Sequence, residues 1–431
     1  MDRTDVVVIG GGLAGLATAA FAARGGRSVT VLEKAGGAGG RAQTTTAGQF
    51  RLNLGPHALY CDGPAERALR ELGVPINGRK PNATGGYAVA KGTAHALPGG
   101  FLSLLTTGLF GVSAKLETAK LLGGLARLDP APLQDVPVTQ WLERDVRHPD
   151  VRALLTGLVR LTSYVGDHQR MSAGTALAQI QGALSKNVRY LDGGWQVLVD
   201  GLAKSATAAG ATLHTGVRAA AVVSTGSGRS VRLADGTSID ADAVVIAAGP
   251  DTAAELLDGP AGAAARTWAA QSVPVRAACL DLGLTRLPQP RATFALGIDR
   301  PLYLSVHSAS AKLAPEGAAM IHVLKYLAGD SDPKADEREL EGLLDLIQPG
   351  WREVVVEHRF LPNMLVSCAL PTAASGGLRG RPDVAVPATD GVYVAGDWVG
   401  TEGLLADASL ASARRAAEAI VARPLRARAA A

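Results

Sequence analysis

The stretch "VVVIGGGLAGLATAAFAARGG", from Val6 to Gly26, decides how this chain folds. It has three readings: an export signal, a membrane span, or a strand–turn–helix that holds a nucleotide. A secretory signal requires a basic start, whereas this chain starts with "MDRTD". A spanning helix requires about 20 predominantly apolar residues, and here three consecutive glycines interrupt the run after a short strand. The residues therefore favour the nucleotide-binding reading.

Each position of the stretch fits a dinucleotide-binding turn. "DVVVI" is typical of a parallel strand that is buried on both faces. Gly10 permits a tight turn, Gly12 lets the backbone approach a pyrophosphate, and Gly15 lets the following helix pack closely against the strand. An Ala-rich helix is predicted from Leu13 to about Arg24, and its N-terminus supplies amides and a positive dipole end. A second strand ends on Glu33, where an acid hydrogen-bonds the ribose hydroxyls of an adenosine.

The overall composition is that of a folded globular protein, and it excludes several function classes. The chain has 431 residues, of which 47% are hydrophobic and 19% charged. The net charge is +4, and the sequence contains no cluster of basic residues, so no nucleic-acid partner is expected. Cys61, Cys279 and Cys368 lie far apart, which excludes a disulfide framework and a clustered zinc site. No metal is expected, and a cytoplasmic location is predicted.

The residues after Glu33 narrow the nucleotide to a flavin. "KAGGAGGRAQT" carries the pair Gly39-Gly40 followed by Arg41. This resembles the signature of the superfamily that contains flavin amine oxidases, protoporphyrinogen oxidase and phytoene desaturases. The resemblance implies FAD, with the glycines close to its diphosphate and the guanidinium in contact with it. It also implies an α/β fold in which a Rossmann-type FAD-binding domain is interleaved with an α+β substrate domain of mixed sheet and helices.

Further motifs along the chain are similar to those of the same superfamily. "NLGPHALY" (53–60) resembles the segment near the flavin ring, and "GVYVAGDWVGTEGLLADAS" resembles the segment at the ribityl chain and the flavin N1/O2 edge. A helix is predicted to begin near Gly403, so that its unpaired amides and dipole face the edge where negative charge accumulates on reduction. The residues that we expect to contact FAD are Gly10, Gly12, Leu13, Ala14, Gly15, Glu33, Lys34, Gly39, Gly40, Arg41, Gly55, Pro56, His57, Val217, Ala248, Gly249, Gly396, Asp397, Gly403, Leu404, Leu405 and Ala406.

Because the cofactor motifs occur in three separated pieces, the two domains must alternate along the chain. The FAD-binding domain is predicted to comprise residues 1–80, 190–258 and 385–425. The substrate domain would comprise 81–189 and 259–384, and a tail would follow at 426–431.

The substrate domain is predicted to contain helices and several strands. A hairpin is expected in 85–98, one or two apolar helices in 101–128, and a helix that places Ala173, Leu177, Ile180 and Leu184 on one face. Strands are expected at 276–284, 302–308, 319–327 and 353–361. Gly92 to Ala114 contains no acid, lysine or arginine. Core helix is the favoured interpretation, with an apolar tunnel lining or a peripheral membrane contact as alternatives.

The expected reaction is hydride removal by the flavin from a mainly apolar organic substrate, in a desaturase or dehydrogenase manner. Flavin amine oxidation is the first alternative, but the strand "RAACLDLGL" lacks the lysine that such relatives usually have, and the chain is only 4% aromatic. A non-redox binding protein or an isomerase is the second alternative. The electron acceptor (oxygen, a quinone or another carrier) and the oligomeric state are left open.

Two further points concern individual side chains. Cys368 is similar in position to the cysteine that attaches FAD covalently in some monoamine oxidases, yet Ala369 stands where an aromatic residue is expected. Non-covalent FAD is therefore favoured. Alternation in "PLYLSVHS" places Tyr303 and His307 on one face of a strand, where they would orient substrate or accept a proton. The other interpretation of this polar face is contact with solvent.

Overall fold

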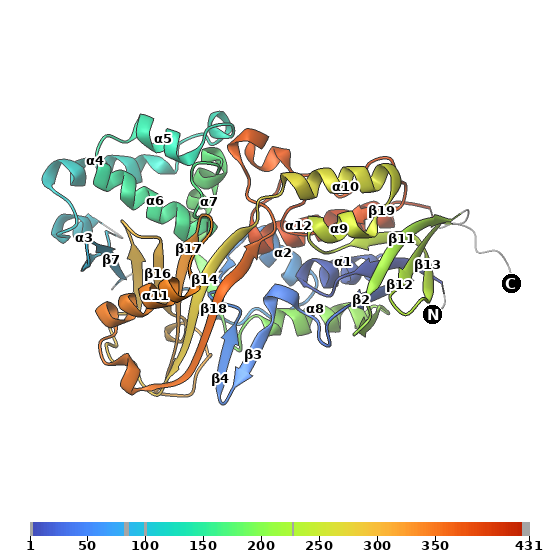
Figure 1. Ribbon diagram of the computed structural model, residues 1–431, viewed down its shortest axis with the longest axis horizontal. Coiled ribbons are helices and arrows are strands. Elements are labelled where there is room, and N and C mark those ends of the chain that lie inside the picture. Colours follow the sequence, from blue (N-terminus) through green and yellow to red (C-terminus); the bar gives the residue numbers. More distant parts are fainter. Residues whose placement is uncertain (1–2, 82–85, 99–100, 226–227, 425–431) are drawn as a thin grey trace.

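The computed structural model describes residues 3–81, 86–98, 101–225 and 228–424, so the predicted tail 426–431 lies outside the described residues. Two large sheets follow one another along the longest axis of the molecule (Figure 1). The predicted α/β class is confirmed.

The first sheet is a mostly parallel, Rossmann-type sheet. Its strand order is β10-β2-β1-β13-β12-β11, and β19 pairs with the end of β13. The bounds are β1 (Thr4–Ile9), β2 (Val29–Glu33), β10 (Thr212–Thr215), β11 (Ala219–Thr225), β12 (Gly228–Leu233), β13 (Ser238–Ile246) and β19 (Val392–Val394). The antiparallel pairs are β11 with β12 and β12 with β13. Val6, Val7 and Val8 are fully buried, as expected for a strand that is covered on both faces. Three separated parts of the chain therefore build this sheet.

Helices pack around the first sheet. They are α1 (Leu13–Arg24), α2 (Pro64–Glu71), α8 (Gln196–Ala208), α9 (Pro250–Leu256), α10 (Gly259–Gln271) and α12 (Leu405–Val421). α1 contacts both α8 and α12, which is why its alanines are buried almost along its whole length. Gly15 is required for the packing of α1 on β1, because a Cβ at this position would lie 1.8 Å from the carbonyl oxygen of Gly10.

The second sheet is mostly antiparallel and has the order β18-β14-β17-β16-β15-β7-β8. The bounds are β7 (Gly86–Ala90), β8 (Thr93–Ala96), β14 (Val275–Leu284), β15 (Phe294–Gly297), β16 (Leu302–Val306), β17 (Ala319–Leu327) and β18 (Val355–Ser367). The hairpin β7–β8 is confirmed, and Lys91 and Gly92 both have positive φ at its tip, as a type I′ turn requires. β15 was not predicted because four residues give too little periodicity.

Helices cover both faces of the second sheet. Figure 1 shows α3 (Phe101–Thr106), α4 (Val112–Leu125), α5 (Val138–Asp145), α6 (Pro149–Ser163) and α7 (Ala173–Lys186) gathered at one end of the molecule. α11 (Pro333–Ile347) packs on β14, β16, β17 and β18. The predicted helix is confirmed as α7. Its Ala173, Leu177 and Ile180 are buried, whereas Leu184 in the last turn is 61% exposed.

Short strands connect the two large sheets. They are β3 (Thr44–Ala47) with β4 (Phe50–Asn53), and β5 (Leu59–Tyr60) with β9 (Val188–Leu191) and β6 (Gly78–Arg79). Arg359 of β18 donates hydrogen bonds to the carbonyl oxygen of Asn53 and to Thr45 Oγ1 at 3.0 Å. The segment after β4, which includes Gly55 to His57, is thereby fixed against the second sheet.

Among the described residues, no helix has the length and apolar character needed to cross a bilayer. The apolar segment 101–128 forms the two helices α3 and α4, and Leu105, Val112 and Leu116 on them are exposed to solvent.

Candidate functional site

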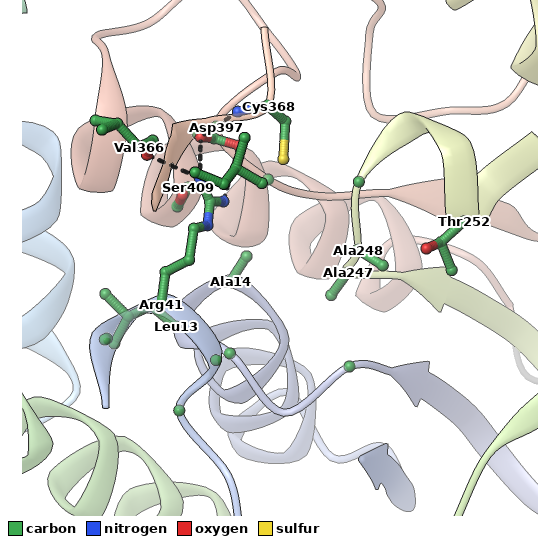
Figure 2. Close-up of a pocket in the computed structure, with 18 of the residues that line it drawn as sticks. Leu13, Ala14, Arg41, Ala247, Ala248, Thr252, Val366, Cys368, Asp397 and Ser409 are labelled. Carbon is green, nitrogen blue, oxygen red and sulfur yellow. Dashed lines mark hydrogen bonds and ion pairs between the residues drawn. The ribbon is translucent and has the colours of Figure 1, made fainter. Parts of the chain in front are cut away.

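A cavity of about 1370 Å³ lies where the carboxyl ends of the parallel strands in the first sheet meet β14 and β18 of the second sheet (Figure 2). The carboxyl ends of parallel strands are where α/β proteins bind nucleotides. The predicted cofactor residues that line this cavity are Gly10, Gly12, Leu13, Ala14, Glu33, Lys34, Gly39, Gly40, Arg41, Pro56, His57, Val217, Ala248, Gly249, Gly396, Asp397, Leu405 and Ala406. Those that lie behind its wall are Gly15, Gly55, Gly403 and Leu404.

The glycine turn forms an open cradle at one end of the cavity. Gly10 has a φ of +112°, and a Cβ there would lie 2.5 Å from the carbonyl oxygen of Ala247. At Gly12, by contrast, the nearest atom to an added Cβ is the carbonyl oxygen of Gly39 at 3.9 Å. The side chain is therefore excluded at Gly10 by the fold, whereas at Gly12 the missing side chain leaves space for a bound group.

Glu33 stabilises the turn in addition to facing the cavity. Its carboxylate accepts hydrogen bonds from the N–H of Gly11 at 2.7 Å and of Ala35 at 2.8 Å. Each carboxylate oxygen can accept more than one hydrogen bond, so both retain capacity for ribose hydroxyls. The N–H of Val217 donates to the carbonyl oxygen of Glu33 at 2.9 Å. A backbone contact of Val217 with FAD would therefore use its carbonyl group.

Arg41 and Asp397 form a bidentate ion pair across the cavity, which Figure 2 displays. The Nη1–Oδ2 and Nη2–Oδ1 distances are 2.6 and 3.1 Å, and Nη1 also donates to the carbonyl oxygen of Val366 at 3.0 Å. Burial would raise the pKa of Asp397, but the Arg41 charge and the N–H of Cys368 lower it to about 2. The Asp397 charge raises the pKa of Arg41 against the effect of burial. Both groups remain ionised at every physiological pH.

The N-terminus of α12 lies at the cavity, one to two residues later than predicted. The helix begins at Leu405 after the N-cap Leu404, and no side chain caps it. Gly403 and Leu405 have φ values of +72° and +55°. Positive φ is strained for leucine, and such strain is concentrated at functional sites. Because of this kink, Leu405 and Ala406 line the cavity, whereas Gly403 and Leu404 do not.

Comparisons with known proteins agree with this geometry. The model of the family "Flavin containing amine oxidoreductase" matches residues 13–421. The chain belongs to this flavoprotein family. It is 27% identical over 271 residues to phytoene dehydrogenase of Streptomyces griseus, covering 56% of this chain and 53% of that protein. It is 24% identical over 380 residues to coproporphyrinogen III oxidase of Bacillus subtilis, covering 76% and 78% of the two chains.

Solved structures show the same fold over nearly the whole chain. An oxidoreductase from Methanosarcina mazei has a TM-score of 0.78 at 20% identity, covering 97% of this chain and 100% of that chain. Putrescine oxidase bound to putrescine has a TM-score of 0.75 at 17% identity, with coverage of 98% and 100%. The chain spans about half the length of phytoene dehydrogenase, the first curated relative given above.

FAD is the cofactor that the family implies, and the residues present fit it. The open space at Gly12 suits a diphosphate, as does the backbone of Gly39 and Gly40, which carries no side chains. Arg41 is 40% exposed toward the cavity despite its ion pair, so its guanidinium is available to a phosphate. Cys368 lines the cavity, but burial, followed by the Asp397 charge, raises the pKa of its thiol to about 12. Because the thiolate is the nucleophile, this environment supports non-covalent FAD.

His57 lies beside Trp195 at the cavity wall. The two rings make an edge-to-face contact at 4.9 Å, and the His57 ring nitrogens lie 3.0 Å from the carbonyl oxygens of Gly55 and Arg41. Burial lowers the pKa of His57, so the ring is neutral and donates to one of the two carbonyls at a time. His57 therefore fixes the loop after β4 and contributes no positive charge to the cavity at neutral pH.

Tyr303 and His307 do not line the cavity. They are buried behind it, which excludes the alternative that their face of the strand contacts solvent. His307 stacks on Tyr190 at 3.8 Å, and Tyr303 Oη lies 3.4 Å from both His307 Nε2 and Tyr190 Oη. β16 ends at Val306, so His307 belongs to a 3-10 turn and strand alternation no longer applies to it.

A buried cluster on β14 and β17 contains potential metal ligands. One ligand atom each of Cys279, Asp281 and His322 lies within 4.8 Å of the others. However, Asp281 already binds His322 Nδ1 at 2.5 Å and the guanidinium of Arg359. Burial, followed by the Asp281 charge, raises the pKa of Cys279 well above its usual value, which keeps the thiol protonated. These residues form a charge-compensated hydrogen-bond cluster and do not present a cation site.

Sequence reasoning missed Arg381, a buried cation beneath the loop that leads into α12. Its Nη1 donates to the carbonyl oxygen of Gly403 at 2.9 Å, while Nε and Nη2 are buried without a partner. Burial lowers the pKa of Arg381 to about 10, so it stays charged. No local pattern in "GGLRGRPD" signals this position, because the residue is recognisable only from the loop that covers it.

Proposed function

We propose that this protein is an FAD-dependent oxidoreductase of the desaturase or dehydrogenase type that acts on a mainly apolar organic substrate. The observation that carries the proposal is the two-sided cavity. Its first-sheet side provides the dinucleotide cradle, and its second-sheet side is lined by Leu361, Met364, Leu365 and Val366 of β18. Bound FAD would supply the hydride-accepting N5 atom, and oxygen, a quinone or another carrier would take up the electrons.

The residues of this chain bind and orient the reactants. The glycine turn and Arg41 bind the diphosphate, and Asp397 holds the Arg41 side chain in one orientation. The neutral His57 and Trp195 close part of the cavity wall and would shield a bound group there from water. The positive end of α12 and the Arg381 charge favour an anion at this end of the cavity.

The names of two relatives support a large, carbon-rich substrate, since they are a phytoene dehydrogenase and a coproporphyrinogen III oxidase. Amine oxidation remains the second candidate, because putrescine oxidase and cyclohexylamine oxidase share the fold. Against it, Ala277 and its neighbours in β14 include no lysine. Among the described residues that line the cavity, the one tyrosine is Tyr164 and the one tryptophan is Trp195. These two side chains do not form a paired aromatic cage.

The deciding experiment is purification followed by anaerobic titration. The visible flavin absorbance should be present in the purified protein and should bleach on addition of an apolar candidate substrate. Bleaching by primary amines alone would favour amine oxidation. Turnover of a substrate isomer without net bleaching would favour an isomerase, and a colourless protein that does not take up added FAD would contradict the proposal.

A second proposal concerns peripheral membrane contact through α3 and α4. Leu105, Val112 and Leu116 are exposed there beside the exposed Lys120, a combination that suits an anionic lipid surface. Wild-type protein should co-sediment with phosphatidylglycerol vesicles, and Leu116→Glu should release it. Leu346→Glu on the exposed side of α11 is the matched control and should leave binding unchanged. Absence of wild-type co-sedimentation would contradict the proposal.

A further inference from the structure

The two sides of the cavity differ in charge. The first-sheet side carries charged residues of both signs, including Glu33, Arg41 and Asp397. On the second-sheet side, Arg276 is the one charged side chain among the described cavity-lining residues. A guanidinium beside a largely apolar wall favours an anionic group on a ligand that binds there, because its hydrogen bonds to an anion are charge-assisted.

Arg276 lies at the mouth of the cavity, where β14 begins. The pairing of β14 with β18 is irregular between Val275 and Arg276. Arg276 is half-buried, while Pro362 and Asn363 beside it are exposed. Its side chain therefore stands between the solvent and the apolar wall.

The internal contacts of Arg276 are weak. Its Nη1 lies 3.4 Å from the carbonyl oxygen of Asn363 and 3.5 Å from Asn363 Oδ1, at the limit of a hydrogen bond. Arg41 and Arg359 instead make close ion pairs with Asp397 and Asp281. In the part of the chain that the structure describes, no carboxylate forms such a pair with Arg276, so its planar fork is available to an external anion.

We propose that Arg276 binds the carboxylate of an otherwise apolar substrate and holds this end at the cavity mouth. This proposal rests on the proposed function and narrows its substrate class to apolar carboxylic acids. A guanidinium matches a carboxylate with two parallel hydrogen bonds, whereas the wall formed by Leu361, Met364 and Leu365 accommodates the hydrocarbon part. The diphosphate of FAD is a different anion and belongs to the glycine turn on the opposite side.

The test is calorimetric titration of the FAD-loaded protein with decanoate, methyl decanoate and decyl phosphate. Wild-type protein should bind decanoate about tenfold or more tightly than methyl decanoate, given the strength of charge-assisted hydrogen bonds. Arg276→Gln should abolish this preference without changing the affinity for FAD, and Arg276→Lys should retain part of it. Arg144→Gln, which removes an exposed arginine outside the cavity, should behave as wild type.

Three results would overturn the proposal: equal affinity of the wild type for acid and ester, an unchanged preference in Arg276→Gln, or tighter binding of decyl phosphate than of decanoate. Calorimetry reads ligand binding independently of flavin chemistry. Absence of the acid preference in the wild type, together with normal flavin bleaching, would therefore reject the role of Arg276 alone, whereas absence of bleaching with an intact acid preference would reject the oxidoreductase.

Discussion

The two sides of the cavity obtain their residues in different ways. The first-sheet side uses turns that follow strand ends, such as Gly10 after β1 and Gly396 after β19, and it binds largely through the backbone. The second-sheet side uses side chains from the long strands β14 and β18. Backbone sites tolerate few residue types, whereas side chains can be exchanged without altering the fold. The difference indicates that few residue types preserve the cofactor site, whereas the residues that select the substrate can change without altering the fold.

The largest effect is expected from Gly15→Ala on the first-sheet side. The added Cβ would lie 1.8 Å from the carbonyl oxygen of Gly10, so α1 must move away from β1. Overpacking typically costs about 1–3 kcal/mol and occasionally more, and we expect the upper part of this range here, which corresponds to about hundredfold weaker FAD binding if it falls on the cradle. Fluorescence titration with FAD measures it. Gly36→Ala, at a position with open space, is the control, and equal affinities in the two variants would contradict the constraint.

Asp397→Asn is expected to have the next largest effect, because it leaves Arg41 without its partner. We expect a loss of about 2–3 kcal/mol in unfolding free energy, less than for a fully buried pair since Arg41 is partly exposed. The pKa of Asp397 is lowered from 3.8 to about 2, so its contribution is present above pH 4 and disappears as the pH falls toward 2. Chemical denaturation between pH 2 and 7 should show the two proteins converging in acid. A constant difference would refute the assignment.

Asp407 in the first turn of α12 should have a pH dependence of stability opposite to that of Asp397. Burial raises its pKa from 3.8 to about 6, although the N–H of Ala65 donates to its carboxylate. The folded state then binds the proton more tightly, so stability falls as the pH rises from about 4 to 6. Asp407→Asn should therefore gain about 1–2 kcal/mol over the wild type at pH 7 and nothing at pH 4. Parallel pH profiles of the two proteins would exclude this shift.

The smallest effect is expected from Tyr303→Phe on the second-sheet side. Its hydroxyl makes only 3.4 Å contacts, so its removal should cost about 1 kcal/mol of stability or less. Since Tyr303 lies behind the cavity, turnover and FAD content should remain near wild-type values. A large fall in turnover with normal FAD content would instead place this hydroxyl in contact with the substrate.

The same difference explains how much the sequence could predict. The strand β1, the turn at Gly10–Gly15, the helix α1 and Glu33 are contiguous, so local pattern and steric rules suffice to predict them. The Arg41–Asp397 pair joins residues far apart in the chain, and only resemblance to known flavoproteins indicated that both meet the cofactor. Arg276, Arg381 and the Asp281–His322–Arg359 cluster depend on strand register and loop coverage, which local patterns do not determine.

The packing of α1 against α12 has a consequence for synthesis of the protein. The first half of the cofactor cradle emerges from the ribosome with residues 10–24, but the strand β19 and the helix α12, which packs on α1, follow about 380 residues later. At typical translation rates of about 5–20 residues per second, this delay lasts roughly 20 to 80 seconds. We therefore expect stable FAD binding only after α12 has been synthesised.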